Sequence, residues 1–176
     1  MGCGLQSDSA STSRVYISLG SNLGDREKNM ASAVHALDQL PQTRVVSVSR
    51  WYETLPLGNV DQPLFLNAAA VLETALDPQT LLRFAKDIEE RLGRLPDSHW
   101  QPRPIDIDIV LWEGVVMASP ELTIPHPAYR HRAFVLVPLA EIAADIRDPI
   151  TDRTVGELAA SPAAEGLVHL YSRRPR

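Results

Sequence analysis

The stretch PRPIDIDIV alternates apolar and acidic side chains with a period of two. Side chains of a β-strand point to opposite faces in turn, so Ile105, Ile107 and Ile109 are predicted to share one face and Asp106 and Asp108 the other. The two carboxylates then lie roughly 7 Å apart along the strand. Because like charges at that separation repel each other, we expect a positively charged partner close by.

The remaining segments supply neighbours for such a strand. One helix is predicted to begin with Asp77 as N-cap and Pro78 at the first helical position, and to end at Gly93. Hydrophobic periodicity and turn residues predict the order βαββαβ, which is typical of an antiparallel sheet with helices packed on it, of class α+β. The predicted strands are 14–22, 43–54, 64–74 and 105–112, the helices are 25–40 and 77–93, and the loops are 55–63 and 94–104. A short strand and turn over 115–122, a helix over 133–143 and a helix over 155–160 capped by Thr154 are predicted to follow.

The chain has the size of one domain, which we expect over residues 15–176. Residues 1–14 are mostly small and polar and contain no apolar signal-peptide core, so we expect a disordered tail there. A net charge of −5 disfavours nucleic acid as a partner. No apolar run is long enough to span a membrane, and a single cysteine is typical of a reducing cytoplasm, so a cytoplasmic location is predicted.

Common catalytic motifs are absent from the sequence. GSNLGDREK has three residues between its glycines and lacks Gly-Lys, so it is not a Walker-type phosphate loop. There is no dinucleotide-binding glycine motif, no His-Glu-x-x-His and no nucleophile elbow. Covalent catalysis by serine or cysteine therefore has no support.

Acidic, basic and polar residues remain as candidates. Asp106 and Asp108 would suit Mg²⁺, which takes a few carboxylates together with water and phosphate oxygens, although a solvated strand face explains them equally well. Arg103 would suit a phosphate oxygen, or else forms an ion pair with Asp106. His126, between two prolines, could donate to a phosphate or cap its own loop, and Asn67 in an apolar strand needs polar partners.

More basic residues flank these positions, namely Arg94 after the helix stop and Arg130, His131 and Arg132 in the run YRHR, although such a run is more often a solvated face. Trp100 lies in a polar loop, where a role in the core is less natural. These features converge on metal-assisted phosphoryl transfer through positioning and charge neutralisation. They do not identify the substrate.

Several motifs in series add a resemblance to a known family. These motifs are HWQPRPIDIDIVL, ISLGSNLGD, YETLPLGNVDQPLFLNAA, IEERLGR and TIPHP followed by RAFVLVPLAEIA. Together they resemble the sequences of the 6-hydroxymethyl-7,8-dihydropterin pyrophosphokinases of folate biosynthesis, over about residues 15–160. The resemblance implies a ferredoxin-like fold with a short helical C-terminal extension, and transfer of the terminal diphosphate of ATP to the hydroxymethyl oxygen of the pterin, with release of AMP. It also implies a monomer that binds two Mg²⁺ ions, ATP and the pterin.

The same resemblance implies roles for individual residues. Asp106 and Asp108 would hold the metal ions and, with Arg103, form the catalytic set. The pterin pocket would comprise Thr54, Leu57, Phe65, Asn67, Trp100 and Phe134, with the two phenylalanines stacking on the ring and Trp100 closing over it. ATP would contact Lys86, Glu89, Arg103, Ile109, Thr123, His126 and Arg132.

The sequence departs from the family pattern in the predicted lid over 94–102. Gln101 stands where a glycine is usual, Pro96 where an arginine is usual, and His99 where a basic residue is usual. A non-catalytic nucleotide- or pterin-binding relative is therefore an alternative hypothesis. An RNA-binding module on a similar sheet is a weaker one, because the chain is acidic and lacks aromatic RNA-binding signatures on its strands.

Overall fold

The computed structural model describes residues 11–56, 61–95 and 101–172. Its main sheet has the strand order β5-β1-β4-β3-β8, and β2 also pairs with β4. The strands are β1 (Ser13–Ser21), β2 (Thr43–Val48), β3 (Tyr52–Thr54), β4 (Phe65–Thr74), β5 (Asp106–Trp112) and β8 (Val168–Leu170). A separate small hairpin pairs β6 (Met117–Ala118) with β7 (Thr123–Ile124).

The central strand β1 runs antiparallel to both of its neighbours, β4 and β5. Strands β2 and β3 pair with successive parts of β4, also antiparallel. This arrangement confirms the predicted α+β class and the antiparallel βαββαβ sheet.

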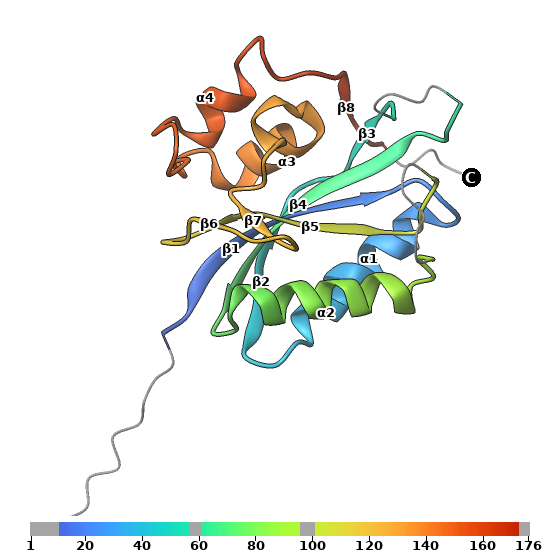
Figure 1. The fold of residues 1–176 in the computed structure, drawn as a ribbon. Coiled ribbons are helices and arrows are strands. Elements are labelled where there is room, and N and C mark those ends of the chain that lie inside the picture. The colour runs from blue at the N-terminus through green and yellow to red at the C-terminus, as the bar shows by residue number, and fades with distance from the viewer. Residues whose placement is uncertain (1–10, 57–60, 96–100, 173–176) are drawn as a thin grey trace, which may run out of the picture.

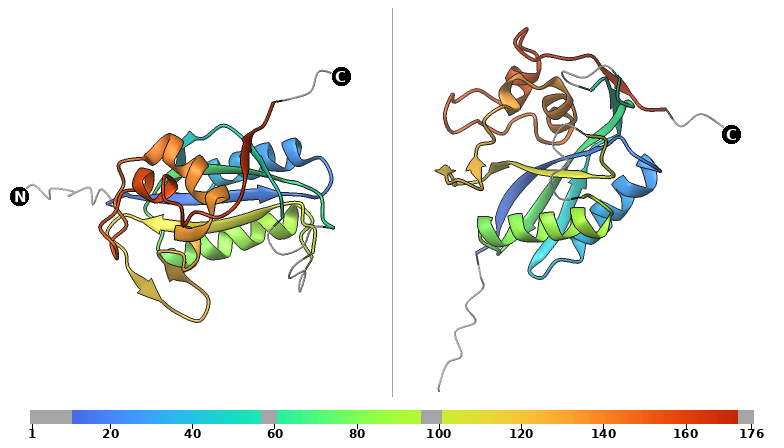
Figure 2. Two further views of the ribbon diagram at one scale, coloured as in Figure 1. Left: turned by 90° about the horizontal axis from the view of Figure 1, so that it is seen from above. Right: turned by 45° about the vertical axis from the view of Figure 1, so that its right-hand side comes forward.

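Helices cover the sheet on both faces (Figures 1 and 2). On one face lie α1 (Arg26–Asp38) and α2 (Pro78–Arg91), which begin at the N-caps Asp25 and Asp77. On the other lie α3 (Ala133–Ala143) and α4 (Val155–Ala159), preceded by a short 3₁₀ turn at Tyr129–His131.

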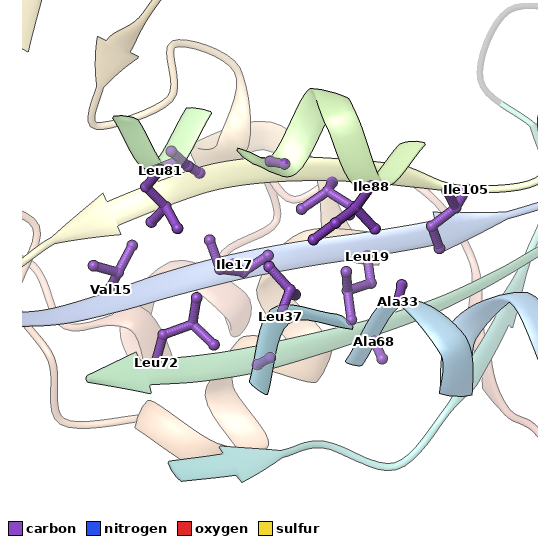
Figure 3. Close-up of a cluster of buried hydrophobic side chains, with 14 of the residues drawn as sticks. Val15, Ile17, Leu19, Ala33, Leu37, Ala68, Leu72, Leu81, Ile88 and Ile105 are labelled. Carbon is purple, nitrogen blue, oxygen red and sulfur yellow. The ribbon is translucent and has the colours of Figure 1, made fainter. Parts of the chain in front are cut away.

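The larger core lies between the sheet and the helices α1 and α2 (Figure 3). Ile105, Ile107 and Ile109 all point into it and are at most 3% exposed. The predicted division of this strand into an apolar and an acidic face is therefore confirmed, because the isoleucine side chains are buried in the core. The two aspartates are left on the opposite face.

The opposite face of the sheet is covered over only part of its area. Tyr16, Val71 and Val110 belong to a second core, to which α3 contributes Leu136 and Leu139. Further along β1, β4 and β5, the residues on this face are small, polar or acidic, namely Gly20, Asn67 and Asp106. None of them belongs to the second core. The candidate site occupies this part of the sheet.

Three boundaries differ from the sequence-based predictions. The predicted strand 43–54 is two strands, because the chain leaves the ladder after Val48: the Ser49 hydroxyl accepts from the Ala69 amide at 2.9 Å and so replaces a backbone acceptor. β1 begins at Ser13, two residues inside the predicted tail, while residues 1–10 lie outside the described ranges. Strand β8 was not predicted at all, since Val168–Leu170 is too short to show a periodicity.

The C-terminal helices agree with their predictions. α3 spans 133–143 in spite of Pro138, and α4 spans 155–159. Thr154 caps α4 as expected, and Glu157 completes a capping box with it. Among the described helices, none is both long enough and apolar enough to cross a lipid bilayer.

A buried carboxylate holds the turn before α3 to the loop before α4. Asp148 is fully buried and accepts hydrogen bonds from the Tyr129 hydroxyl at 2.5 Å, from two nitrogens of the Arg130 guanidinium, and from the Ile150 amide at 2.7 Å. Burial by itself would raise the pKa of Asp148, but these donors outweigh it and lower the pKa to about 2. The ionised carboxylate is therefore part of the fold at neutral pH.

We predict that Asp148→Asn destabilises the fold in a pH-dependent way. A pKa that folding lowers stabilises the native state above the unfolded pKa, near 3.8, and this contribution is lost as the pH falls towards about 2. The shift corresponds to about 2 kcal/mol. In urea unfolding, the gap between wild type and variant should therefore shrink by about 1 kcal/mol between pH 7 and pH 3, and the remainder should be lost only as the pH falls to about 2 and below. A gap that is the same at both pH values would contradict the assignment, and Tyr129→Phe, which removes one donor, should cost less at pH 7.

Candidate active site

A cavity of 350 Å³ opens over the uncovered part of the sheet. Its floor crosses three strands: Gly20 of β1 lies opposite Asp106 of β5 on one side and opposite Asn67 of β4 on the other. The cavity is lined by Ser18, Gly20, Thr54, Leu55, Pro56, Gln62, Phe65, Asn67, Lys86, Arg94, Arg103, Asp106, Asp108, His126, Arg132 and Phe134. The structure therefore brings together most of the residues that were predicted to form the site.

Gly20 makes room for its neighbours on the cavity floor. A Cβ atom at this position would lie 3.3 Å from Asn67 Oδ1 and 3.6 Å from the Phe65 ring. The first contact is tight, so Asn67 would have to shift by a few tenths of an ångström, whereas the second is an ordinary van der Waals contact. Sequence reasoning missed this role, although a glycine inside a strand pattern is a recognised signal of a close approach.

Asp108 faces the cavity without a direct counter-charge. Among the described residues, none donates a hydrogen bond to its carboxylate or forms an ion pair with it. Burial first, and then the neighbouring Asp106 carboxylate, raise the pKa of Asp108 to about 6. The lack of a direct partner and the raised pKa are what a carboxylate that receives a cation from solution would show.

Asp106, in contrast, is already neutralised by arginines. Arg94 Nη1 lies 2.5 Å from its Oδ1 atom, and Arg103 Nη1 lies 3.4 Å from its Oδ2 atom. The ion pair that was the competing explanation for Arg103 is therefore present in this structure. Arg94 was noted in the sequence but given no role, and its only signal there was its position directly after the helix-ending Gly93.

Glu89 of α2 lies beneath the acidic pair and is 1% exposed. Its Oε1 atom accepts from the amide of Ile107, the residue between the two aspartates, at 2.7 Å, and lies 2.7 Å from Arg94 Nη1. Its Oε2 atom accepts from Lys86 at 3.0 Å. Glu89 lines neither this cavity nor the smaller one of 230 Å³ beside it, and its contact with ATP stays a prediction.

His126 is held in a defined tautomer. Its Nδ1 atom accepts from the Ala128 amide at 3.2 Å, and its own amide donates to the Val110 carbonyl at 2.9 Å. Burial and the charge of Arg132 lower the pKa of His126, so the ring is neutral at pH 7 and its proton is assigned to Nε2. Both proposed roles are thus compatible, since one nitrogen caps the loop and the other can donate.

The predicted pterin residues that lie within the described ranges line the cavity of 350 Å³ from three elements. Thr54, Phe65 and Asn67 come from β3 and β4, and Phe134 from α3. Asn67 is 2% exposed and donates through Nδ2 to the Thr54 hydroxyl at 2.8 Å, which fixes the orientation of the amide. Leu57 and Trp100, predicted for the same pocket, lie outside the described residues, as do Pro96 and His99.

The predicted ATP residues divide between this cavity and a smaller one of 230 Å³. Thr123 and Ile109 line only the smaller cavity, whereas Arg103 and Arg132 line only the larger. Lys86, Asp108 and His126 line both, so the two spaces adjoin at these three side chains.

Asn22 is a structural contributor that sequence reasoning missed. Its side chain accepts from the Arg103 amide at 2.8 Å and donates to Gln62 Oε1 at 3.2 Å, and its own amide donates to the Arg103 carbonyl at 3.2 Å. It therefore ties the segment before β5 to the loop before β4. The guanidinium of Arg103 lies 5.9 Å above the centre of the Phe65 ring.

The donor set limits which metal the site could hold. In the described part of the chain, no group of three or more histidine, cysteine, aspartate or glutamate side chains forms a metal cage. Asp106 and Asp108 offer only hard carboxylate oxygens, and phosphate groups and water would have to supply the other ligands. That combination fits Mg²⁺, which keeps several waters and usually binds through one or two carboxylates.

Comparisons with known proteins agree with this geometry. Residues 16–144 match the model of the family described as 7,8-dihydro-6-hydroxymethylpterin-pyrophosphokinase. The chain is 46% identical over 154 residues to a 2-amino-4-hydroxy-6-hydroxymethyldihydropteridine pyrophosphokinase of Methylorubrum extorquens, with 88% of this chain and 96% of that protein covered. It is 43% identical over 157 residues to the protein of the same name from Pseudomonas aeruginosa, with 89% and 96% covered.

Solved structures show the same fold at lower sequence similarity. A crystal structure of Plasmodium falciparum HPPK-DHPS superposes with a TM-score of 0.69 at 17% identity, and the match covers 87% of this chain and 46% of that one. The ferredoxin-like arrangement predicted for the sheet and helices is confirmed.

We predict that Asp108→Asn and Asp106→Asn change the stability of the ligand-free protein in opposite directions. Because folding raises the pKa of Asp108, its ionised form destabilises the native state at pH 7.5, by about 1–3 kcal/mol, and this penalty disappears below about pH 4. Asparagine should therefore raise the melting temperature at position 108. At position 106 it should lower it, since it leaves Arg94 without its closest partner. Thermal unfolding in EDTA at pH 7.5 measures both, and a destabilising Asp108→Asn would contradict the prediction.

Proposed function

Because the chain belongs to the 7,8-dihydro-6-hydroxymethylpterin-pyrophosphokinase family, we propose that it transfers the terminal diphosphate of ATP to 6-hydroxymethyl-7,8-dihydropterin and releases AMP, a step of folate biosynthesis. The observation that carries this proposal is the placement of Asp106 and Asp108. They lie on the cavity floor, and Asp108 also lines the adjoining cavity that collects predicted ATP residues.

The two adjoining cavities suggest where each substrate lies. The pterin ring would occupy the larger one, between Phe65 and Phe134, where aromatic stacking and a polar edge are both available. Asn67 and Thr54 would read that edge through hydrogen bonds. The nucleoside of ATP would occupy the smaller cavity, beside Ile109 and Thr123, with its phosphates directed across Asp108.

Asp106 and Asp108 would hold Mg²⁺, and on the family pattern two ions. When bound, the metal neutralises phosphate charge and polarises the phosphorus under attack. Asp108 provides a carboxylate that has no direct partner among the described residues. Asp106 provides a carboxylate that is paired with Arg94, so Arg94 would have to share it with the metal or move away from it.

The transfer exchanges one P–O bond for another. The hydroxymethyl oxygen of the pterin bonds to the β-phosphorus of ATP, the bond from that phosphorus to the α–β bridging oxygen breaks, and AMP leaves with the bridging oxygen. The hydroxymethyl proton is lost to solvent or to a phosphate oxygen. The protein's part is to hold both substrates in line and to supply positive charge.

Three cationic or donor groups of the chain face the phosphates in this proposal. Arg103 and Arg132 line the larger cavity, and their guanidinium groups can donate in pairs to phosphate oxygens. The Nε2–H of His126 adds a neutral donor. The Arg132 guanidinium also lies 5.7 Å from the centre of the Phe134 ring, which links the phosphate side to the pterin side.

We further propose a monomer that acts in the cytoplasm and has neither nucleic acid nor a membrane as a partner. The net charge of −5 supports the part on nucleic acid, and the single cysteine is typical of a reducing compartment.

We predict that the purified protein forms AMP from ATP only when both 6-hydroxymethyl-7,8-dihydropterin and Mg²⁺ are present. Chromatographic separation of AMP, ADP and ATP measures this, and EDTA in excess over Mg²⁺ should abolish it. Tight binding of both substrates without AMP would contradict the proposal and favour a non-catalytic relative.

We predict that Asn67→Ala weakens binding of the pterin about tenfold or more, because a lost hydrogen bond at a buried polar edge costs about 1–3 kcal/mol. The affinity for a non-hydrolysable ATP analogue with Mg²⁺ should change less than about twofold, since Asn67 lines only the larger cavity. Calorimetric titration of each ligand provides the comparison. Equal losses for both ligands would refute the assignment of this wall to the pterin.

A further inference from the structure

The C-terminal segment 164–171 contacts two elements that contribute walls to the larger cavity, the start of α3 and the strand β3. It leaves α4 on the helical side and runs across to the outer side of β3 (Figures 1 and 2). The family match ends at residue 144, so the matched region does not include this segment. Leu167 is 68% and Leu170 51% exposed, whereas Ala164 and Tyr171, at the two ends of the segment, pack against the two hydrophobic cores.

The first attachment is to the wall that carries Arg132 and Phe134. The Glu165 amide donates to the His131 carbonyl at 2.8 Å, and the Ala133 amide donates to the Glu165 carbonyl at 3.0 Å. These two bonds form a parallel bridge between Glu165 and Arg132. The backbone of Arg132 is thus held from outside the cavity.

The second attachment is to the wall that carries Thr54. β8 pairs antiparallel with β3, and Val168 lies directly opposite Thr54. The Tyr171 amide donates to the Trp51 carbonyl at 2.9 Å and extends the pairing by one residue. Without β8, β3 would be a three-residue edge strand whose backbone pairs with β4 alone, with one side-chain hydrogen bond from Tyr52 to Glu141 of α3 at 2.5 Å.

A polar cluster fastens the end of the segment. The Tyr171 hydroxyl donates to Glu27 Oε1 at 2.8 Å, and the Arg26 guanidinium lies 5.9 Å from the centre of the Tyr171 ring. The same guanidinium donates to Glu53 Oε1 and to the Leu64 carbonyl, both at 2.8 Å. It therefore joins the segment to the residues on either side of the loop that begins after Thr54.

We propose that residues 164–171 act as a positioning strap that sets the distance between the wall that carries Arg132 and Phe134 and the wall that carries Thr54 before either ligand arrives. Glu165 and Val168 are three residues apart and the chain bends between them at Gly166, so the connection spans at most about 10 Å and ties the two walls closely. A preset cavity lowers the cost of ordering its walls on binding. The inference rests on the proposed function for the identity of the two ligands.

The test loosens each attachment separately in the full-length chain. His169 lies two residues from Tyr171, so its amide also faces β3, whereas its side chain is exposed. His169→Pro removes that donor, and His169→Ala is the matched control that keeps it. Glu165→Pro removes the donor to His131, and Glu165→Ala, which changes only an exposed side chain, is its control.

Binding of the pterin and of α,β-methylene-ATP with Mg²⁺ is measured by calorimetry for all four variants and the wild type. We expect His169→Pro to raise the Kd of the pterin about fivefold to tenfold and that of the nucleotide by less than about twofold. Glu165→Pro should raise the Kd of the nucleotide more than that of the pterin, because it frees Arg132, whereas Phe134 stays packed against the second core. Both alanine variants should match the wild type.

Other results would overturn the strap. Proline variants that bind both ligands like their alanine controls would show that the walls need no tie. Equal losses for both ligands, together with a lower melting temperature, would show only a general structural role. If the wild type binds neither ligand, both the proposed function and the strap fail. If the wild type binds both ligands and the proline variants bind them equally well, only the strap is refuted.

Discussion

The buried carboxylate of Glu89 is the interaction on which the candidate site depends. It joins three parts of the chain at one point: the amide between the two aspartates, the guanidinium of Arg94 and the ammonium group of Lys86. A carboxylate that is 1% exposed is stable in such a position only when donors surround it. Once these donors are in place, the register of β5 relative to α2 is set, and both aspartates are directed upwards into the cavity.

The incomplete cover on one face of the sheet explains why the site is where it is. Helices α1 and α2 bury the apolar side of β1, β4 and β5 along its length, whereas α3 and α4 bury only part of the other side. On the remaining part, Gly20, Asn67 and Asp106 lie in one row across three strands. A rigid, well-packed layer thus supports side chains that contribute little to packing, which is a favourable arrangement for positioning reacting groups.

The alternation in PRPIDIDIV was sufficient to predict which residues of β5 are buried and which face the site, because a period of two has only one reading on a half-covered sheet. Turn and capping residues likewise located α1, α2 and α4. The break between β2 and β3 could not be predicted, since it depends on a hydroxyl of Ser49 that bonds to a distant strand. Strand β8 could not be predicted either, because it owes its conformation to β3 and not to its own three residues.

For the site, residue types that suit phosphate, metal and a planar ring indicated most of the cavity lining. The ion pair between Arg94 and Asp106 was not foreseen, because nothing in the spacing shows that the chain turns back after Gly93. This pair has a consequence for selectivity among incoming ions. A bare divalent ion would have to evict a guanidinium that already compensates the carboxylate, whereas a metal–nucleotide complex offers the evicted guanidinium a phosphate in exchange. The ligand-free molecule thus supplies a counter-ion of its own to Asp106 and leaves Asp108 without a direct one among the described residues.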